Sequence, residues 1–267
     1  MVFISLTIQI SRLELLERRK YLNVYIVSDH HFFDTQAMIL SGRDYQPDTN
    51  GMVLNAIDMF NLHNASVDKD DFVIFLGDVA RLNSKTKKIF KEMLPQMKGH
   101  KILIKGNHDK KSDQFYYESG FEAISDYLIV GRFFLCHYPL NEIHSAHEKL
   151  LLKIAKHHKC DTIIHGHVHT TEKKSLSDKE FTRINVCVDY SEMIPTKFSE
   201  NIFKTFAKNL LKKLEKGYKL PQTYHFFENN KHLFEEKRKG NYTKQFRENY
   251  TITKERRKKS ETFKRVA

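Results

Sequence analysis

Five short polar clusters, each placed directly after an apolar run, constrain the fold of this chain more than any other feature of its sequence. The apolar runs lie at 24–27, 72–76, 102–104, 133–135 and 163–164, and their β-branched and aromatic residues predict buried strands. The clusters that follow them are Asp-His-His at 29–31, Gly-Asp at 77–78, Gly-Asn-His-Asp at 106–109, Cys-His-Tyr-Pro at 136–139 and Gly-His-Val-His at 166–169. Because open α/β sheets place their chemistry at the carboxyl ends of strands, this pattern predicts one sheet edge that carries a site for more than one metal ion.

The central cluster shows what each residue type contributes. Asn107 offers a neutral carbonyl ligand, and His108 offers an imidazole, the acid and base that works near neutral pH. Asp109 is expected to hold that imidazole in one tautomer. Taken alone, this tetrapeptide is equally compatible with a polar turn after a strand, and the four other clusters decide for a site.

Residue spacing adds to the prediction of metal ligands. Asp29 and His31 are two residues apart, as are His167 and His169, so at a strand end the members of each pair project to the same side and can bind one cation. His30, between the first two, is expected to point elsewhere and either to support the ligands or to be structural.

Asp78 has two carboxylate oxygens and can therefore bridge two cations. The ordinary alternative for an aspartate after a strand is a helix N-cap, but the following Val79 and Ala80 do not resemble a helix start. A lone histidine after a strand, such as His137, is more often structural, but its register with the other clusters favours a ligand.

In this order the clusters resemble the motifs of the calcineurin-like metallophosphoesterases, in particular their small bacterial and phage members. That pattern is D-x-H, G-D, G-N-H-D, a lone H and G-H-x-H, and the resemblance covers roughly residues 22–195 with every motif present. Cys136 departs from it, because relatives commonly carry a small hydroxyl residue there, and Cys187 stands where a glycine is usual. The resemblance and the alternation of strands and helices imply an α/β sandwich of two mixed β-sheets flanked by helices.

The resemblance also implies a set of ligands for two divalent transition-metal ions. One ion would be held by Asp29, His31, Asp78 and His169, and the other by Asp78, Asn107, His137 and His167. This set of ligands combines carboxylate, imidazole and amide groups and contains no thiolate. It suits Mn²⁺, Fe, Co²⁺, Ni²⁺ or Zn²⁺, and Mn²⁺ is the first choice.

The implied reaction is metal-dependent hydrolysis of a phosphate ester. His108, which is not a ligand, would stabilise the phosphoryl charge or protonate the leaving oxygen, and Asp109 would orient it. Arg43, in a loop expected at 32–48, lies about where relatives carry a phosphate-contacting arginine, and a solvated loop charge is its alternative. Arg81 is a second candidate for substrate contact.

Several functional classes remain open. A phosphodiester is the first choice of substrate, a phosphomonoester (including a phosphoprotein) is the second, and a non-catalytic scaffold of the same fold is a third reading. Asp-His-His is also the signature of an unrelated phosphoesterase family, but the other motifs of that family are not visible in this sequence.

The hydrophobic pattern predicts a helix at 51–63, with residues 52, 53, 56, 57, 59 and 60 facing the core, and a single strand at 124–130. Residues 184–190 resemble the closing strand of the small bacterial and phage members.

We expect three segments along the chain. Residues 1–21 would add a strand and a helix packed on the core, 22–198 would form the phosphoesterase domain, and 199–267 would form a basic extension. The extension begins with an amphipathic helix at 199–218, whose apolar residues at 202, 206, 210 and 214 would dock on the core or on a partner.

The net charge of +12 is concentrated in this extension. Residues 200–267 contain 19 Lys and Arg against 8 Asp and Glu, which leaves the first 199 residues near neutrality. Cationic segments with interspersed aromatic residues can follow a nucleic-acid backbone, so nucleic acid is a candidate partner of the tail. A solvated, partly disordered tail is the alternative.

The remaining bulk properties favour a cytoplasmic protein without a membrane partner. Three widely spaced cysteines, an odd number, argue against a disulfide framework. No run approaches the ~18 apolar residues of a membrane span. The N-terminus lacks the basic stretch and the cleavage site of a signal peptide.

Overall fold

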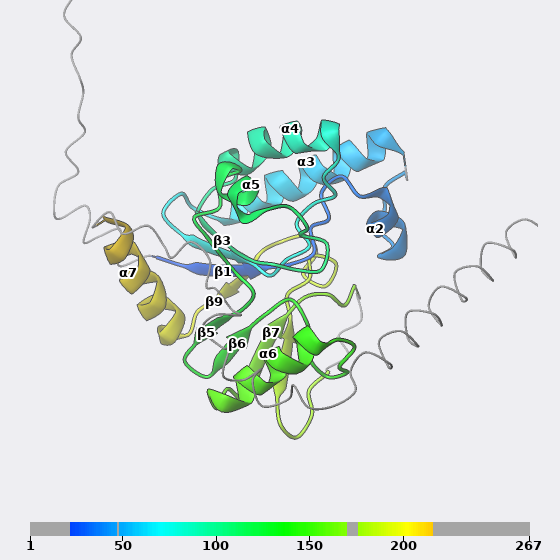
Figure 1. Ribbon diagram of the computed structural model, residues 1–267. Coiled ribbons are helices and arrows are strands. Elements are labelled where there is room, and N and C mark those ends of the chain that lie inside the picture. The colour runs from blue at the N-terminus through cyan, green and yellow to red at the C-terminus, as the bar shows by residue number, and fades with distance from the viewer. Residues whose placement is uncertain (1–21, 47, 170–175, 216–267) are drawn as a thin grey trace, which may run out of the picture. The chain divides into compact units, whose positions relative to one another are not determined.

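The computed structural model describes residues 22–46, 48–169 and 176–215. Two β-sheets and their flanking helices make up this part of the chain (Figure 1). The addition expected at 1–21 and the tail expected beyond the last helix lie outside the described residues, so the predictions for them stay predictions.

The first sheet contains five strands in the order β4-β3-β2-β1-β9. These strands are β1 Val24–Val27, β2 Phe72–Phe75, β3 His100–Ile104, β4 Ala123–Ser125 and β9 Thr196–Phe198. Strands β1 to β4 are mutually parallel, whereas β9 pairs with β1 in the antiparallel direction. The carboxyl ends of β1, β2 and β3 therefore meet at one edge.

The second sheet contains four strands in the order β5-β6-β7-β8. These strands are β5 Leu128–Val130, β6 Phe133–Leu135, β7 Thr162–His165 and β8 Thr182–Asn185. Strand β5 is antiparallel to β6, and the other two pairings are parallel. The predicted α/β sandwich of two mixed sheets is confirmed.

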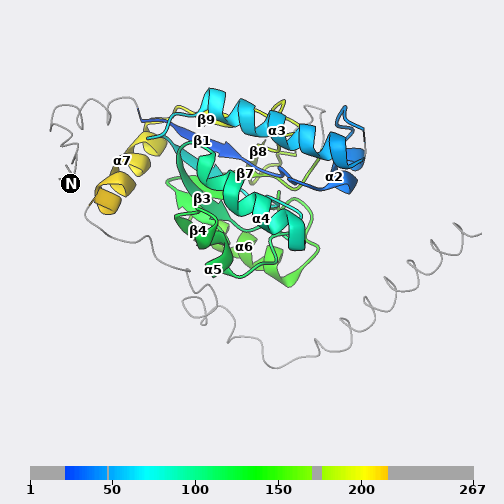
Figure 2. The same cartoon turned by 90° about the horizontal axis from the view of Figure 1, so that it is seen from above.

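Helices cover the outer faces of both sheets. Helices α3, α4 and α5 lie over the five-stranded sheet and α6 lies beside the four-stranded sheet (Figures 1 and 2). The bounds are α2 Thr35–Leu40, α3 Thr49–Ser66, α4 Ser84–Met93 with a 3₁₀ turn at Leu94–Gln96, α5 Asp113–Glu118, α6 Ala146–His157 and α7 Asn201–Glu215. None of the described helices is long and apolar enough to cross a membrane.

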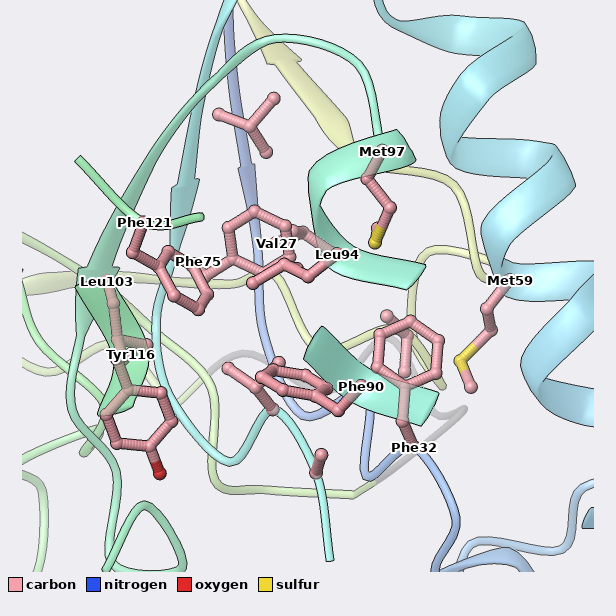
Figure 3. Close-up of a cluster of buried hydrophobic side chains, with 14 of the residues drawn as sticks. Val27, Phe32, Met59, Phe75, Phe90, Leu94, Met97, Leu103, Tyr116 and Phe121 are labelled. Carbon is pink, nitrogen blue, oxygen red and sulfur yellow. The ribbon is translucent and has the colours of Figure 1, made fainter. Parts of the chain in front are cut away.

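The alternation of side chains along each strand builds two apolar cores. Val24 and Ile26 of β1 belong to the core that residues of both sheets share, whereas Tyr25 and Val27 belong to the core beneath the helices. Figure 3 shows part of this second core, in which Val27 and Phe75 lie with aromatic and sulfur-containing side chains from the helices. Strands buried on both faces read as continuous apolar runs, which is why the sequence reveals them so clearly.

Helix α7 docks on the core between the sheets. Its residues Phe203, Ala207 and Leu210 are buried there, whereas Ile202 is 41% exposed. The predicted helix is therefore present and packs on the core through the expected Phe206 and Leu210 together with Phe203 and Ala207, whereas the expected Ile202 is largely exposed.

The structure differs from the sequence-based expectations in three elements. The single strand expected at 124–130 is two strands, β4 and β5, which belong to different sheets, and the chain passes from one sheet to the other between them. The loop expected at 32–48 contains helix α2. In α3, Val53 and Ile57 were expected to face the core but are 41% and 48% exposed, because Asn55 and His63 occupy part of the buried face.

Candidate metal centre

The loops that follow β1, β2, β3, β6 and β7 converge, and main-chain hydrogen bonds connect them. The Asp29 N–H donates to the Gly77 carbonyl at 3.1 Å, and the His31 N–H donates to the Asp78 carbonyl at 3.0 Å. The Gly166 N–H donates to the His137 carbonyl at 3.0 Å, which joins the loops of the second sheet. Polar side chains from five distant parts of the sequence are thus brought together.

Asp29, His31 and His169 form the first group of candidate ligands. Asp29 Oδ2 accepts from the Ser28 hydroxyl at 2.6 Å and from the His167 N–H at 2.8 Å, so this oxygen is used within the protein. Asp29 Oδ1 lies 3.6 Å from His169 Nε2. The first group thus presents one carboxylate oxygen and two imidazoles.

Asp78, His137 and His167 form the second group. His137 Nε2 lies 3.1 Å from His167 Nδ1 and 3.0 Å from Asn107 Oδ1, so the amide oxygen of Asn107 faces the same point. Asp78 Oδ2 lies 3.4 Å from His137 Nε2 and 3.5 Å from His31 Nε2. This oxygen therefore stands between the two groups, the position that a bridging carboxylate needs.

Hydrogen bonds on the far side of two imidazole rings select their tautomers. His137 Nδ1 lies 2.8 Å from the Leu76 carbonyl oxygen, so it donates there. His169 Nδ1 lies 2.6 Å from Asp189 Oδ2 and donates to that carboxylate. In the neutral form of both rings this leaves the Nε2 lone pair facing the centre, as metal-binding histidines require.

The backbone at the candidate ligands is strained. The φ angles of Asp29, His31, Asp78 and His167 are 60°, 46°, 52° and 68°, which places four non-glycine residues in the left-handed region. Such conformations cost of order 1–3 kcal/mol each and cluster at functional sites. The strain indicates that side-chain placement at these positions outweighs backbone preference.

Glycines permit the close approach of the loops. Gly77 has a φ of 84°, and a Cβ there would collide with the backbone of Gly106. A Cβ at Gly166 would collide with the Ser28 hydroxyl and the Asp29 carboxylate. These glycines of the Gly-Asp and Gly-His-Val-His clusters are therefore steric requirements of the site.

The charges of the site are strongly coupled. Burial opposes ionisation of Asp78, but the hydrogen bond and charge of His137 outweigh it and hold the pKa of this carboxyl well below its usual range. Burial likewise disfavours a charged His137, but Asp78 and Asp29 raise the pKa of this imidazole to about 9. The site therefore favours positive charge between its carboxylates.

The residues present fit two divalent cations. Within the described residues, the buried atoms Asp29 Oδ1 and His31 Nε2 have no hydrogen-bond partner. Buried polar atoms are almost always satisfied, so these two indicate a missing partner, and a cation is one that a carboxylate oxygen and an imidazole nitrogen can share. The mixed oxygen and nitrogen donor set suits first-row transition ions.

His108 lies at the open side of the centre. Its side chain is 54% exposed, and Nε2 lies 3.9 Å from Asp78 Oδ2. Its ring centroid is 5.2 Å from that of His31. The backbone N–H of His108 donates to Asp78 Oδ1 at 2.8 Å, which fixes the loop while the imidazole stays accessible.

Asp109 makes contacts other than the predicted one. Its buried carboxylate accepts from the backbone N–H groups of Asp78 at 2.7 Å, Gly106 at 2.9 Å and Val79 at 3.2 Å. These bonds use both carboxylate oxygens, and the orientation of His108 by Asp109 stays a prediction. Asp109 connects the loop after β2 to the loop after β3.

Arg43 is buried beneath the centre instead of solvated. It donates to both oxygens of Asp189, at 2.7 and 3.2 Å, and to Asn55 Oδ1 at 3.3 Å. It also donates to the carbonyls of Asp29 at 2.9 Å and His30 at 2.8 Å. With its N–H groups used in this way and a side chain only 2% exposed, Arg43 contacts the supporting residues and not the open side of the centre.

Arg81 lies on the open side. Its side chain is 54% exposed, and it donates to Asp34 at 3.2 Å and to Gln36 at 3.0 Å. It lines a pocket together with His31 and His108.

Asp189 belongs to the site, although the residues predicted from the sequence did not include it. This residue lies within 184–190, the segment that resembles the closing strand of related proteins. It directly follows the apolar residues 186–188, so the signal that marked the other clusters was present. Asp189 also forms a close group with His169 and Cys187. Cys187 Sγ lies 3.4 Å from Asp189 Oδ2, and burial raises the pKa of this thiol, so it remains protonated.

Comparisons with known proteins agree with this geometry. The sequence model of the family described as calcineurin-like phosphoesterase matches residues 22–171. An uncharacterized protein of Methanocaldococcus jannaschii is 35% identical over 92 residues, which are 34% of this chain and 49% of that protein, so the chain spans about half the length of the curated relative it matches.

Two solved structures are also similar. A protein of unknown function from Aquifex aeolicus has a TM-score of 0.54 and 24% identity, over 66% of this chain and 95% of that one, which shows a shared fold. The nuclease MPE of Pseudomonas putida has a TM-score of 0.33 and 19% identity, over 57% of this chain and 62% of that one.

Proposed function

This chain belongs to the calcineurin-like phosphoesterase family, and on that premise we propose that it is a metal-dependent hydrolase of phosphate esters, with a phosphodiester as substrate. The observation that carries the proposal is the position of Asp78 Oδ2 within 3.5 Å of both His31 and His137, between two groups of ligands. Two divalent ions held there would supply Lewis acidity towards a phosphoryl group and would lower the pKa of a water molecule at the site.

The ligand roles in this proposal follow the two groups. One ion would be held by Asp29, His31, Asp78 and His169, and the other by Asp78, Asn107, His137 and His167. Mn²⁺ remains the first choice of ion. Asp189 and the Leu76 carbonyl act on the far side of His169 and His137, where they fix the rings with Nε2 towards the centre.

His108 is the residue proposed to act on the substrate. Its imidazole is exposed, lies beside the centre and shares a pocket with His31 and Arg81. A proton donated from this ring to the leaving oxygen would avoid release of an alkoxide, and a positive charge here would stabilise the phosphoryl oxygens. Arg81 is proposed to contact the substrate from the same side.

The alternatives are a phosphomonoesterase and a non-catalytic scaffold. Every expected ligand is present and directed at one place, which argues against a scaffold. A pocket of about 310 Å³ beside His31 and His108 offers room for an ester group of the substrate, and a diester remains the first choice.

Paired assays test the proposal. After treatment with chelator and reconstitution with Mn²⁺, the protein should hydrolyse bis-p-nitrophenyl phosphate faster than p-nitrophenyl phosphate, and Asp78→Asn should abolish both activities. Faster hydrolysis of the monoester would favour the phosphomonoesterase, and no hydrolysis of either ester under any reconstitution would overturn the proposal.

A further inference from the structure

A cationic pocket adjoins the candidate metal centre. The cavity of about 310 Å³ has His31 and His108 in its wall, together with the basic side chains of Arg81, Lys110 and Lys111. Arg81 belongs to the loop after β2, and the two lysines directly follow Asp109 in the loop after β3. Three cations thus line a space that begins at the candidate catalytic residue.

The walls of this pocket are fixed relative to the metal ligands. The buried carboxylate of Asp109 accepts from the backbone N–H groups of Asp78, Val79 and Gly106, so the two loops that carry the cations are joined immediately before the lysines and near Arg81. Below them, the Tyr116 hydroxyl donates to Asp109 at 3.4 Å, which adds a contact from α5. The loop segments that carry the basic residues are therefore held beside Asp78.

The positive charge of the pocket is only partly balanced. Its one carboxylate, Asp34, pairs with Arg81 at 3.2 Å. Within the described residues, no acidic side chain forms an ion pair with Lys110 or Lys111, although Lys105 and Lys91 nearby in the structure each have one. Two ammonium groups in this pocket are thus available to an anionic ligand.

We propose that the pocket binds a second phosphate of the substrate, next to the phosphate that is hydrolysed, and that Lys110 and Lys111 are its ligands. This inference rests on the proposed function, because it places the hydrolysed phosphate at the metal centre. The substrate class is then a phosphodiester that carries a further phosphate, either in a nucleic-acid strand or in a multiply phosphorylated small molecule. The volume is sufficient for such a group, since ligand sites of this size are common.

A matched pair of chromogenic esters tests the proposal. Thymidine 5′-(p-nitrophenyl phosphate) and the same compound with a 3′-phosphate differ only in the second phosphate. For the Mn²⁺-loaded protein, the 3′-phosphate should raise kcat/KM on the order of tenfold, as charge-assisted hydrogen bonds to two lysines allow. The double variant Lys110→Gln/Lys111→Gln should bring that ratio close to one.

A control variant separates local contacts from net charge. Lys149 and Lys153 are exposed on α6 and do not line the pocket, so Lys149→Gln/Lys153→Gln removes the same charge elsewhere. This control should keep the tenfold ratio. A ratio near one in the wild type, or an undiminished ratio in the Lys110/Lys111 variant, would overturn the proposal.

Equilibrium binding makes the inference independent of turnover. By calorimetry, thymidine 3′,5′-bisphosphate should bind the Mn²⁺-loaded protein on the order of tenfold more tightly than thymidine 5′-monophosphate, and the Lys110/Lys111 variant should lose this difference. Tighter bisphosphate binding without hydrolysis would support the pocket and refute the hydrolase, whereas equal binding and equal hydrolysis would refute the pocket and leave the hydrolase.

A further rise in kcat/KM with 5′-esters of longer oligothymidylates would identify a strand as the source of the second phosphate, and a plateau would identify a small molecule.

Discussion

Asp189 links three residues that are distant in sequence. Its carboxylate accepts from His169 Nδ1 at 2.6 Å and from Arg43 Nε at 2.7 Å. Arg43 in turn donates to the carbonyl of Asp29, so one buried ion pair supports ligands from the first and last clusters. Because a metal-binding imidazole depends on the group behind it, Asp189 and Arg43 are positioning residues in this account.

Replacing Asp189 should weaken metal binding. In Asp189→Asn the amide can present an N–H towards His169 Nδ1 and no longer neutralises Arg43, so we expect the affinity of the ion held by His169 to fall by about 10–100-fold. Competition with a chromophoric chelator measures this. Asp161→Asn is the matched control, because Asp161 also pairs with an arginine, Arg132 at 2.9 Å, but on the surface. Equal affinities of the wild type and Asp189→Asn would contradict this role.

Replacing His108 should reduce turnover without weakening metal binding. It is not among the ligands, and its exposed ring faces the pocket, so His108→Ala should bind both ions as the wild type does and lose about 10²–10⁴-fold in kcat on a phosphodiester. Metal content by elemental analysis and rates on bis-p-nitrophenyl phosphate check the two halves. Wild-type turnover in this variant would show that His108 does not act on the substrate.

At the scale of elements, the order of strands explains why five clusters form one site. Strands β1, β2 and β3 are parallel neighbours and end at one edge, and β6 and β7 bring two more clusters from the second sheet. Asp109 ties the loops after β2 and β3 through three backbone N–H groups. The loops are thus anchored to each other as well as to their strands.

Loss of this anchor should destabilise the protein. In Asp109→Asn one oxygen remains for three donors, and the amide N–H faces backbone N–H groups, so the free energy of unfolding should fall by about 2–3 kcal/mol. Urea denaturation of the metal-free protein measures the change. Asp113→Asn is the comparison, because Asp113 is half-buried and pairs with Lys105. This substitution should lower the free energy of unfolding by less than about 1 kcal/mol. A loss at Asp109 no larger than this would contradict the anchoring role.

The sequence predicted elements better than contacts between them. Apolar runs marked β1, β2, β3, β6 and β7 because buried strands have no polar alternation, and the spacing of Asp29 and His31 marked one side of a loop. The contact of Asp109 with the loop after β2 and that of Arg43 with Asp189 join residues 30 and 146 positions apart, and no local pattern reports such pairs. The break between β4 and β5 was missed for the same reason, since both segments are apolar and only their partners differ.

For the whole molecule, buried histidines couple stability to pH. His63 of α3 lies in the helix-side core, with Nε2 donating to the Lys98 carbonyl at 2.9 Å. Burial lowers the pKa of His63 to about 4, and Lys101 and Lys98 act in the same direction against the carbonyl. The unfolded chain, with an ordinary pKa of about 6.5, therefore binds a proton more readily than the folded protein.

Acidification should therefore destabilise the folded protein through His63. The contribution of His63 to the free energy of unfolding is fully present above about pH 6.5. It decreases as the pH drops from about 6.5 to about 4, by about 3 kcal/mol in total, and does not change further at lower pH. In His63→Gln the free energy of unfolding should lose this part of its pH dependence, as measured by urea titrations at pH 7 and 4.5. His157→Gln, at an exposed position in α6, should keep the wild-type slope. An unchanged slope in His63→Gln would show that His63 titrates alike in both states.

The proposed hydrolysis depends above all on two ions that share the carboxylate of Asp78. Anomalous diffraction from crystals of the full chain grown with Mn²⁺ tests it most directly. We expect two anomalous peaks on either side of Asp78 Oδ2, one among Asp29, His31 and His169 and one among Asn107, His137 and His167. A single peak, peaks elsewhere, or no peak in protein shown to be saturated with Mn²⁺ would contradict it.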